Sequence, residues 1–334
     1  MSFLNWHPAQ LAQLQQRAAQ QSLPHALLFQ GQAGIGKTSF AMEFARGLLC
    51  ERPIGQMPCG ECHACKMTLA GSHPDLLRIE REVNDEGKVS KEIKIDQIRD
   101  LCERFTQTSQ FGHYKIAVIS PAERMNRNAA NSLLKTLEEP VPQTLIILVT
   151  SEPSRLLPTI RSRCQRLVFQ QPEFPSIKTW LTQHCPNEDP QGLLNAAEGA
   201  PMHAVHLVES GMLNLRDKLL RQFLRVAKQQ EDPLQFAKQC LEGDSDIVLS
   251  WLVRCVEDIA LLQADSQQSL STLSSAELAQ SLQVLAKQID LAEVMHYIDK
   301  LRTAKRLLNT NANSLLIFES LMLDWVDITQ PVTT

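Results

Sequence analysis

Apolar and polar residues follow two different patterns along the first half of the chain. Short apolar runs predict buried strands at 25–30, 76–79, 115–119, 145–149 and 167–169. Apolar residues at helical spacing predict helices at 1–22, 39–49, 96–107, 122–138 and 154–161. Strands that alternate with helices are typical of βαβ units, so we expect an α/β domain whose parallel sheet is flanked by helices.

The pattern changes near residue 170, where Pro172 and Pro175 mark a linker. From there the spacing is helical to about residue 327, and Gly211 interrupts it close to a second candidate boundary. We therefore expect an α/β domain, a small helical domain and a larger all-α domain. These domains are predicted to cover 1–168, 169–210 and 211–334.

The composition is that of a folded globular protein, since 43% of the 334 residues are hydrophobic and 21% are charged. The longest apolar run, 145–149, is far shorter than the roughly 20 residues of a membrane span, and residues 1–6 lack the basic residues of an export signal. We therefore expect a cytoplasmic protein without membrane contact. The net charge of -4 argues against a uniformly basic DNA-binding surface, and the 5% aromatic content against a stacking platform for single strands.

The segment GQAGIGKT matches the G-x-x-x-x-G-K-[ST] spacing of a phosphate-binding loop, between a predicted strand and a predicted helix. Gly31, Gly34 and Gly36 permit backbone conformations that aim N–H groups at a phosphate. Lys37 would reach the outer phosphates, and Thr38 would ligate Mg²⁺. The alternative is a glycine-rich turn that binds nothing. The complete match favours a pocket for ATP or ADP with Mg²⁺, and the sequence leaves open which nucleotide occupies it.

The acidic residue that P-loop NTPases carry after a second strand is missing here. The predicted strand 115–119 is followed by Ser120 and Pro121, and neither is a carboxylate. Glu123 could be a displaced acid, but we favour a solvated charge at the start of a helix. The chain thus keeps a phosphate cradle without hydrolytic residues, which favours weak or no ATPase activity.

Four cysteines lie in one short stretch with the spacing C-x8-C-x2-C-x2-C: Cys50, Cys59, Cys62 and Cys65. Four thiolates suit the tetrahedral geometry of a structural Zn²⁺ site and leave no position open for catalysis. A redox C-x-x-C pair would need only two of them, and an iron–sulfur site or a set of free thiols is also compatible with the spacing. We favour Zn²⁺, held by a module at about 50–66 that is inserted in the α/β domain.

Arg161 and Arg163 follow a short predicted helix and precede the strand at 167–169. Solvation or a surface ion pair is the ordinary role of such arginines. In an oligomeric P-loop protein, however, an arginine can reach a neighbour's γ-phosphate, to which its planar fork is suited. A chain that lacks hydrolytic acids and carries such an arginine fits donation of this side chain to another subunit.

The order of these motifs resembles that of bacterial clamp-loader AAA+ subunits, and most of all their delta-prime subunit family. The resemblance rests on the phosphate loop, the four-cysteine spacing, His73-Pro74-Asp75, the LLKTLEEP block at 133–140 and Ser162-Arg163-Cys164. It covers residues 1 to about 210, and the helical remainder matches the family in length.

The resemblance implies an AAA+ domain, a small helical lid and a C-terminal helical collar. It also implies a hetero-pentamer with motor gamma/tau subunits and delta, which loads the sliding clamp onto primed template DNA at replication forks on the nucleoid. In that assembly Arg163 would be the arginine finger for a neighbour's ATP, and Thr150 would lie at the sensor-1 position. Motor subunits carry Gly-Ser-x-Arg as sensor 2, whereas this chain has Gly-Ala-Pro-Met at 199–202.

Two functions are compared on these grounds. The first is a non-hydrolysing clamp-loader subunit of the DNA polymerase III holoenzyme, a scaffold that donates Arg163 in trans. The alternative is an active gamma/tau-type motor ATPase, which Ser120, Pro121 and Met202 oppose. A zinc-dependent nucleic-acid-binding module is disfavoured by the single cysteine cluster and the negative net charge.

Overall fold

A computed structural model describes residues 6–330 of the chain, except 56, 85–86, 88, 112–113, 265–277 and 309–311. The chain forms two compact units. We call Met1–Leu181 with Gly199–His203 the α/β unit, and Thr182–Glu198 with Ala204–Thr334 the helical unit. The chain therefore passes between the two units three times. The division into three domains stays a prediction.

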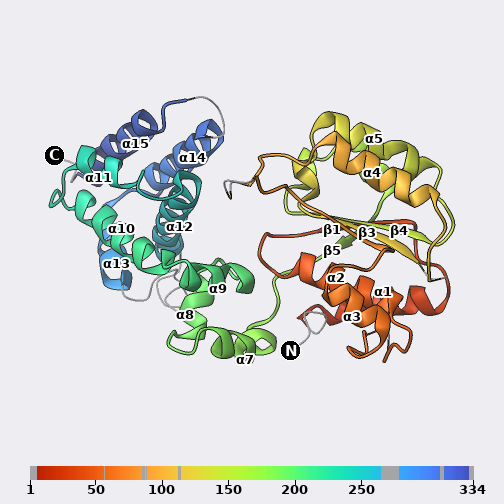
Figure 1. Ribbon diagram of the computed structural model, residues 1–334. Helices are drawn as coiled ribbons and strands as arrows, with labels where there is room; N and C mark the ends of the chain where they lie inside the picture. The colour runs from red at the N-terminus through yellow and green to blue at the C-terminus, as the bar shows by residue number, and fades with distance from the viewer. Residues whose placement is uncertain are drawn as a thin grey trace. The chain divides into compact units, whose positions relative to one another are not determined.

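The α/β unit contains a five-stranded parallel sheet in the order β2-β3-β4-β1-β5 (Figure 1). Its strands are β1 (Ala26–Gln30), β2 (Leu76–Ile79), β3 (Lys115–Ile119), β4 (Thr144–Thr150) and β5 (Gln165–Val168). Each strand overlaps an apolar run identified in the sequence. The three central strands β1, β3 and β4 are buried on both faces and consist mostly of apolar residues, whereas the edge strands β2 and β5 are partly exposed. The predicted parallel α/β fold is confirmed.

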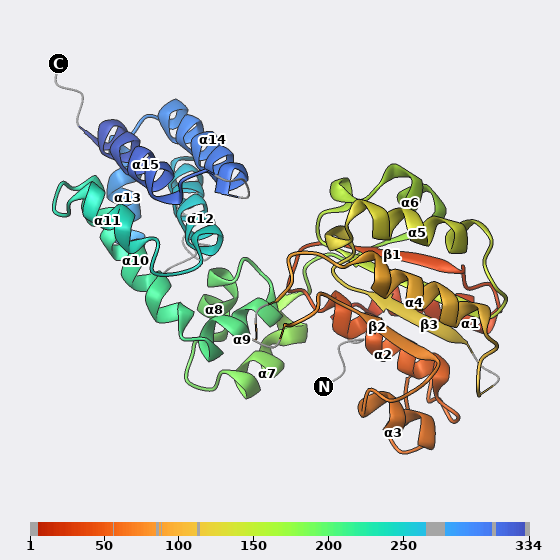
Figure 2. The ribbon, with the colours of Figure 1, turned by 45° about the horizontal axis from the view of Figure 1, so that its top comes forward.

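Helices cover both faces of this sheet. They are α1 (Pro8–Ala19), α2 (Lys37–Leu49), α4 (Ile95–Thr106), α5 (Arg127–Glu138) and α6 (Pro158–Arg163). The α/β unit also contains α3 (His63–Leu69), which contacts α2, and most of α7 (Phe174–His184), whose last three residues belong to the helical unit. One apolar cluster joins α1 and α2 to one face, and a second joins α4, α5 and α6 to the other (Figure 2). Along β1, Leu28 packs in the second cluster while its neighbours Leu27 and Phe29 pack in the first, as the period of a strand requires.

The predicted helix at 122–138 is two elements in the structure, the 3-10 turn η2 (Ala122–Arg124) and α5. Asn126 separates them because its side chain accepts the N–H of Ala129 at 2.9 Å and caps α5. The predicted helix at 154–161 likewise consists of the 3-10 turn η3 (Pro153–Arg155) followed by α6.

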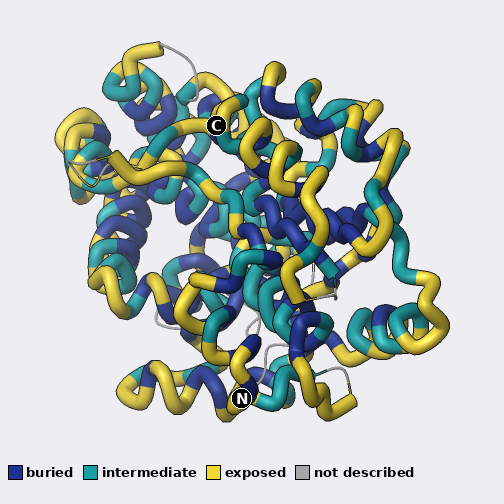
Figure 3. The backbone as a smooth tube through the Cα atoms, turned by 45° about the vertical axis from the view of Figure 1, so that its right-hand side comes forward, coloured by how far each residue is buried: buried dark blue, intermediate teal, exposed yellow. Residues whose placement is uncertain are grey.

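The helical unit confirms that the chain after the sheet is helical. Its helices are α8 (Pro190–Ala196), α9 (Pro201–Glu209) from Ala204 onward, α10 (Met212–Ala227), α11 (Pro233–Gln239), α12 (Ser245–Ala264), α13 (Ala279–Gln288), α14 (Leu291–Leu308) and α15 (Ser314–Thr329). Buried Trp325 stacks on Phe223 and Tyr297 at centroid distances of 4.5 and 5.1 Å. Figure 3 shows buried and exposed positions alternating along the helices, the pattern of amphipathic helices around a core.

Candidate functional site

The carboxyl ends of β1, β3 and β4 carry the residues of the predicted nucleotide pocket. Parallel strands end at the same edge of a sheet, where ligands bind in open α/β folds. The phosphate loop follows Gln30, the last residue of β1, and Ser120 follows β3. Thr150 is the last residue of β4, and Ser151 follows it. Residues far apart in the sequence therefore meet around the loop.

The glycines of the phosphate loop take conformations that other residues avoid. Gly34 and Gly36 have φ angles of 75° and 90°, and Gly36 precedes the first turn of α2. A side chain at Gly31 would begin 2.3 Å from the carbonyl oxygen of Phe169, so only glycine fits there. The backbone has the form that a phosphate cradle needs.

Lys37 is held inside this loop, with only 4% of its surface exposed. Its Nζ donates to the carbonyl oxygens of Gly31, at 2.6 Å, and of Gln32, and to Ser151 Oγ at 3.3 Å. Burial lowers the pKa of Lys37 to about 8, and the charge of Glu123 opposes this shift. The ammonium is therefore directed into the loop by neutral oxygen atoms.

Thr38, the predicted Mg²⁺ ligand, is hydrogen-bonded to Ser120 through their hydroxyl groups at 2.8 Å. Ser120 stands where the acid of a P-loop NTPase would follow β3, so this position offers a neutral oxygen in place of a carboxylate. Thr150 is buried, and its Oγ1 accepts the N–H of Glu152 at 3.1 Å. That hydrogen bond occupies an acceptor site of Thr150 at the end of β4.

Glu123 is the clearest correction to the residue-level expectations. We expected a solvated charge, but the Oε1 atom accepts the N–H of Ser151 at 3.1 Å. The Oε2 atom is shielded from solvent and has no hydrogen-bond partner among the described residues. The η2 turn directs this carboxylate towards the end of β4, beside the residue that also accepts from Lys37. Glu123 therefore contributes a negative charge to the pocket.

The short segment 199–203 lies against the phosphate loop. The N–H of Met202 donates to the carbonyl oxygen of Gly34 at 3.0 Å. A side chain on Gly34 would meet the Cβ atoms of Ala200 and His203, each at 3.1 Å. Met202 thus contacts the loop through its backbone.

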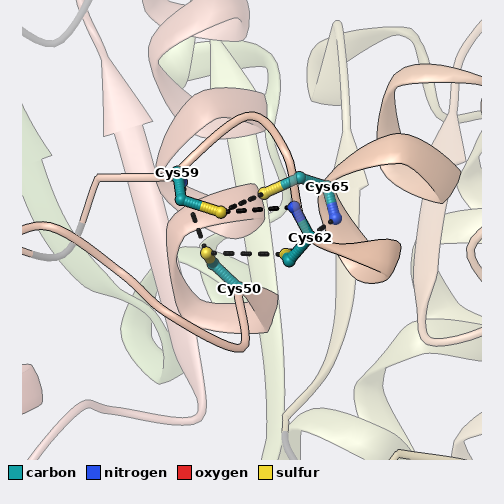
Figure 4. A group of neighbouring side chains, drawn as sticks. All are labelled: Cys50, Cys59, Cys62 and Cys65. Carbon is teal, nitrogen blue, oxygen red and sulfur yellow. Dashed lines mark hydrogen bonds between the residues drawn. The ribbon is translucent and has the colours of Figure 1, made fainter.

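The four predicted metal ligands converge in a separate place, between the end of α2 and the start of α3 (Figure 4). All four Sγ atoms lie within 4.8 Å of one another. The Cys50–Cys62 and Cys59–Cys65 sulfur distances are 3.8 and 3.9 Å. Thiolates at about 2.3 Å from a tetrahedral Zn²⁺ are about 3.8 Å apart, so the geometry fits the ion. The cluster can hold a metal ion.

The thiols of this cluster differ in their surroundings. The N–H groups of Cys62 and Glu61 lower the pKa of Cys59 to about 6, whereas burial raises the pKa of Cys65 to about 12. A bound cation favours the thiolate form of every ligand. Within the described part of the chain, no second group of His, Cys, Asp or Glu side chains converges in this way.

Arg163, the candidate finger, is the last residue of α6, with 35% of its side chain exposed. Its Nη2 lies 2.6 Å from Oε1 of Glu138 at the end of α5. Its Nη1 donates to the carbonyl oxygen of Thr159 at 3.0 Å. These partners all come from α5 and α6, so the chain's own phosphate loop does not supply them.

Comparison with known proteins gives the family. Residues 6–173 match the family described as "DNA polymerase III, delta subunit", and residues 210–327 the one described as "DNA polymerase III, delta subunit, C terminal". The DNA polymerase III subunit delta' of Pseudomonas aeruginosa is 34% identical over 331 residues, 98% of each chain. The chain belongs to the delta' subunit family of DNA polymerase III. The delta' subunit of Bacillus subtilis is 31% identical over 310 residues, 90% of each chain.

Likeness to the motor subunits is shorter. The tau/gamma subunit of Haemophilus influenzae is 32% identical over 197 residues, which cover 57% of this chain and 28% of that protein. The match to delta' subunits extends over nearly the whole chain, and this favours delta' over the motor alternative. Among the residues that the structure describes, no helix is long and apolar enough to cross a membrane.

Sequence reasoning missed two residues of these sites, Ser151 and Glu138. Ser151 could have been found because it follows β4 at the same sheet edge as the phosphate loop. Glu138 belongs to the LLKTLEEP block used for the resemblance, but nothing in its spacing indicates Arg163 as its partner.

Proposed function

We propose that this chain is a clamp-loader subunit that helps ATP-driven loading of a sliding clamp onto primed DNA during replication, in the cytoplasm at replication forks. Its neighbours would be motor gamma/tau subunits and delta in a hetero-pentamer. The likeness to delta' subunits over nearly the whole chain carries this proposal. Within the complex the chain is a scaffold that hydrolyses little ATP and donates Arg163 to a neighbour's nucleotide.

The domains of this proposal are those expected from the sequence: an AAA+ domain at 1–168, a lid at 169–210 and a collar at 211–334. The collar would join the subunits to one another. The match of residues 210–327 to a C-terminal family of its own supports a boundary near 210.

We further propose that the phosphate loop binds ATP or ADP without hydrolysing it efficiently. Gly31, Gly34 and Gly36 would present N–H groups to the phosphates, and Lys37 would turn from the loop carbonyls to the outer phosphate. Thr38 would face Mg²⁺ without an acid at Ser120, and Thr150 would lie at the sensor-1 position. A Mg²⁺ without a carboxylate ligand at Ser120, and a Glu123 carboxylate bound to the Ser151 backbone, are consistent with binding rather than turnover.

Zn²⁺ is the ion that we propose for the four-cysteine cluster, with Cys50, Cys59, Cys62 and Cys65 as its ligands. The sulfur distances and the all-thiolate donor set support this choice. A closed site of this kind supplies no catalysis and would stabilise the module at about 50–66.

ATP turnover by the isolated chain is expected to be negligible, because Ser120 and Pro121 supply no base for water and Glu123, the carboxylate of this pocket, is bound to the N–H of Ser151. Steady-state hydrolysis should be measured on the isolated chain, on its partner subunits and on the reconstituted complex with clamp and primed DNA. The complex should hydrolyse ATP and load clamps, and omission of this chain should abolish both activities. Robust turnover by the isolated chain, or full loading without it, would contradict the proposed function.

Nucleotide affinity should fall as the pH rises above about 8, because the lowered pKa of Lys37 lies there. A bound phosphate favours the ammonium form, so binding above this pH requires uptake of a proton, and affinity is lost as pH increases. Titration calorimetry with ADP between about pH 7 and pH 9.5 should show a loss of roughly thirtyfold. Lys37→Arg, which stays charged, is the matched control and should show a flat profile. A flat wild-type profile would exclude this role of Lys37.

A further inference from the structure

The ion pair between Arg163 and Glu138 joins the ends of two neighbouring helices. Glu138 is the last residue of α5, Arg163 is the last residue of α6, and the Nη2–Oε1 distance is 2.6 Å. The helices lie side by side in the α/β unit (Figure 2). Ile160 of α6 and Leu137 of α5 belong to the same buried cluster, so the backbones that carry the pair are fixed by core packing.

Two acceptors hold the guanidinium of Arg163. Glu138 takes an N–H from Nη2, and the carbonyl oxygen of Thr159 takes one from Nη1. A guanidinium has five N–H groups, so donors remain for a further anion. About a third of the Arg163 side chain is exposed, which leaves it accessible to a partner.

The surroundings favour the arginine in this position. The last carbonyl groups of α5 carry the negative end of the helix dipole, which attracts a cation placed beside Glu138. A free arginine samples many rotamers, and the contacts to Glu138 and Thr159 reduce that number before any partner arrives. Fewer rotamers lower the entropic cost of placing the guanidinium at a phosphate.

We propose that Glu138 is a positioning residue for Arg163: it presents the guanidinium in one orientation to the γ-phosphate of a neighbouring subunit. This inference rests on the proposed role of Arg163 as a finger donated in trans. The inference gives a role to Glu138, the first of the two carboxylates in the LLKTLEEP block. The second, Glu139, is exposed and has no ion pair among the described residues.

The test uses the reconstituted complex with clamp and primed DNA, and four variants of this chain: Glu138→Gln, Glu139→Gln, Arg163→Ala and the double variant Glu138→Gln/Arg163→Ala. Both kcat and KM for ATP are measured, and gel filtration checks assembly. Glu138→Gln should lower kcat about two- to fivefold at unchanged KM, in the range expected for a partly exposed ion pair. Glu139→Gln should match the wild type, and the double variant should equal Arg163→Ala.

The four variants distinguish failure of this inference from failure of the proposal that Arg163 is an arginine finger. If Arg163→Ala lowers kcat but Glu138→Gln leaves it unchanged or raises it, Glu138 does not position the finger. A further loss in the double variant beyond Arg163→Ala would show that Glu138 acts by another route and would also overturn the inference. If Arg163→Ala has no effect, the finger proposal fails, and the role of Glu138 fails with it.

Discussion

Replacing Arg163 with alanine is expected to slow ATP hydrolysis at the neighbouring subunit's site by about 10³-fold, the lower end of what a finger contributes. The substitution removes the charge and its N–H donors from the γ-phosphate in the transition state. Ile160, which anchors α6 in the core, is untouched, so the helix should stay in place. Single-turnover hydrolysis and clamp loading in the reconstituted complex measure the effect, with gel filtration to confirm assembly.

Two further variants serve as comparisons for Arg163→Ala. Arg166→Ala removes an exposed arginine of β5 and should leave hydrolysis close to that of the wild type. Lys37→Ala should reduce loading less than Arg163→Ala, because nucleotide in this chain is proposed to bind without turnover. Equal damage from Lys37→Ala would give the bound nucleotide a larger role, and normal hydrolysis with Arg163→Ala would contradict the finger.

Replacing Cys62 with serine is expected to release the metal and unfold the module at about 50–66. Structural zinc contributes on the order of 10 kcal/mol to ordering such a site, far more than the small apolar cluster around the thiols supplies. The sheet should survive, because its two core clusters contain none of the four cysteines. Metal analysis should find no zinc, and hydrogen exchange should show lost protection confined to the module.

Cys240→Ala provides the matched control for this experiment. Cys240 is fully buried in the helical unit, far along the chain from the module, and the substitution should retain one zinc per chain. Freshly purified wild-type protein without zinc would refute the assignment of the metal. Unchanged protection of residues 50–66 in Cys62→Ser would show that the module folds without it.

The centre of the sheet could be predicted from the sequence because β1, β3 and β4 are buried on both faces. A strand such as β4 is apolar throughout its centre, and a short apolar run of that kind is typical of a buried parallel strand. The prediction of one helix at 122–138 was less accurate, because the apolar spacing of this segment continues across Asn126. The capping hydrogen bond from Ala129 to that side chain decides where α5 begins, and it competes locally with helical continuation.

The phosphate loop and the cysteine spacing could be recognised because each is local, and convergence of the thiols followed from C-x-x-C geometry. Glu123 and Glu138 could not be assigned in this way. Their partners, Ser151 and Arg163, lie on other elements of the fold, and the contacts exist only once α5, α6 and β4 are in place. Residue type and spacing do not indicate which residues on different elements will be in contact, and for this reason the prediction of a solvated Glu123 was wrong.

The chain crosses between its two units three times, and this has a consequence for limited proteolysis. The segment 199–203 belongs to the α/β unit, yet the residues on both sides of it belong to the helical unit. A single proteolytic cut in any of the three connections therefore leaves part of one fragment seated in the unit formed by the other. Met202 of this segment donates a hydrogen bond to Gly34, and the same residue lies in the first turn of α9, which continues into the helical unit, so one helix carries both the contact to the phosphate loop and the start of the larger helical region.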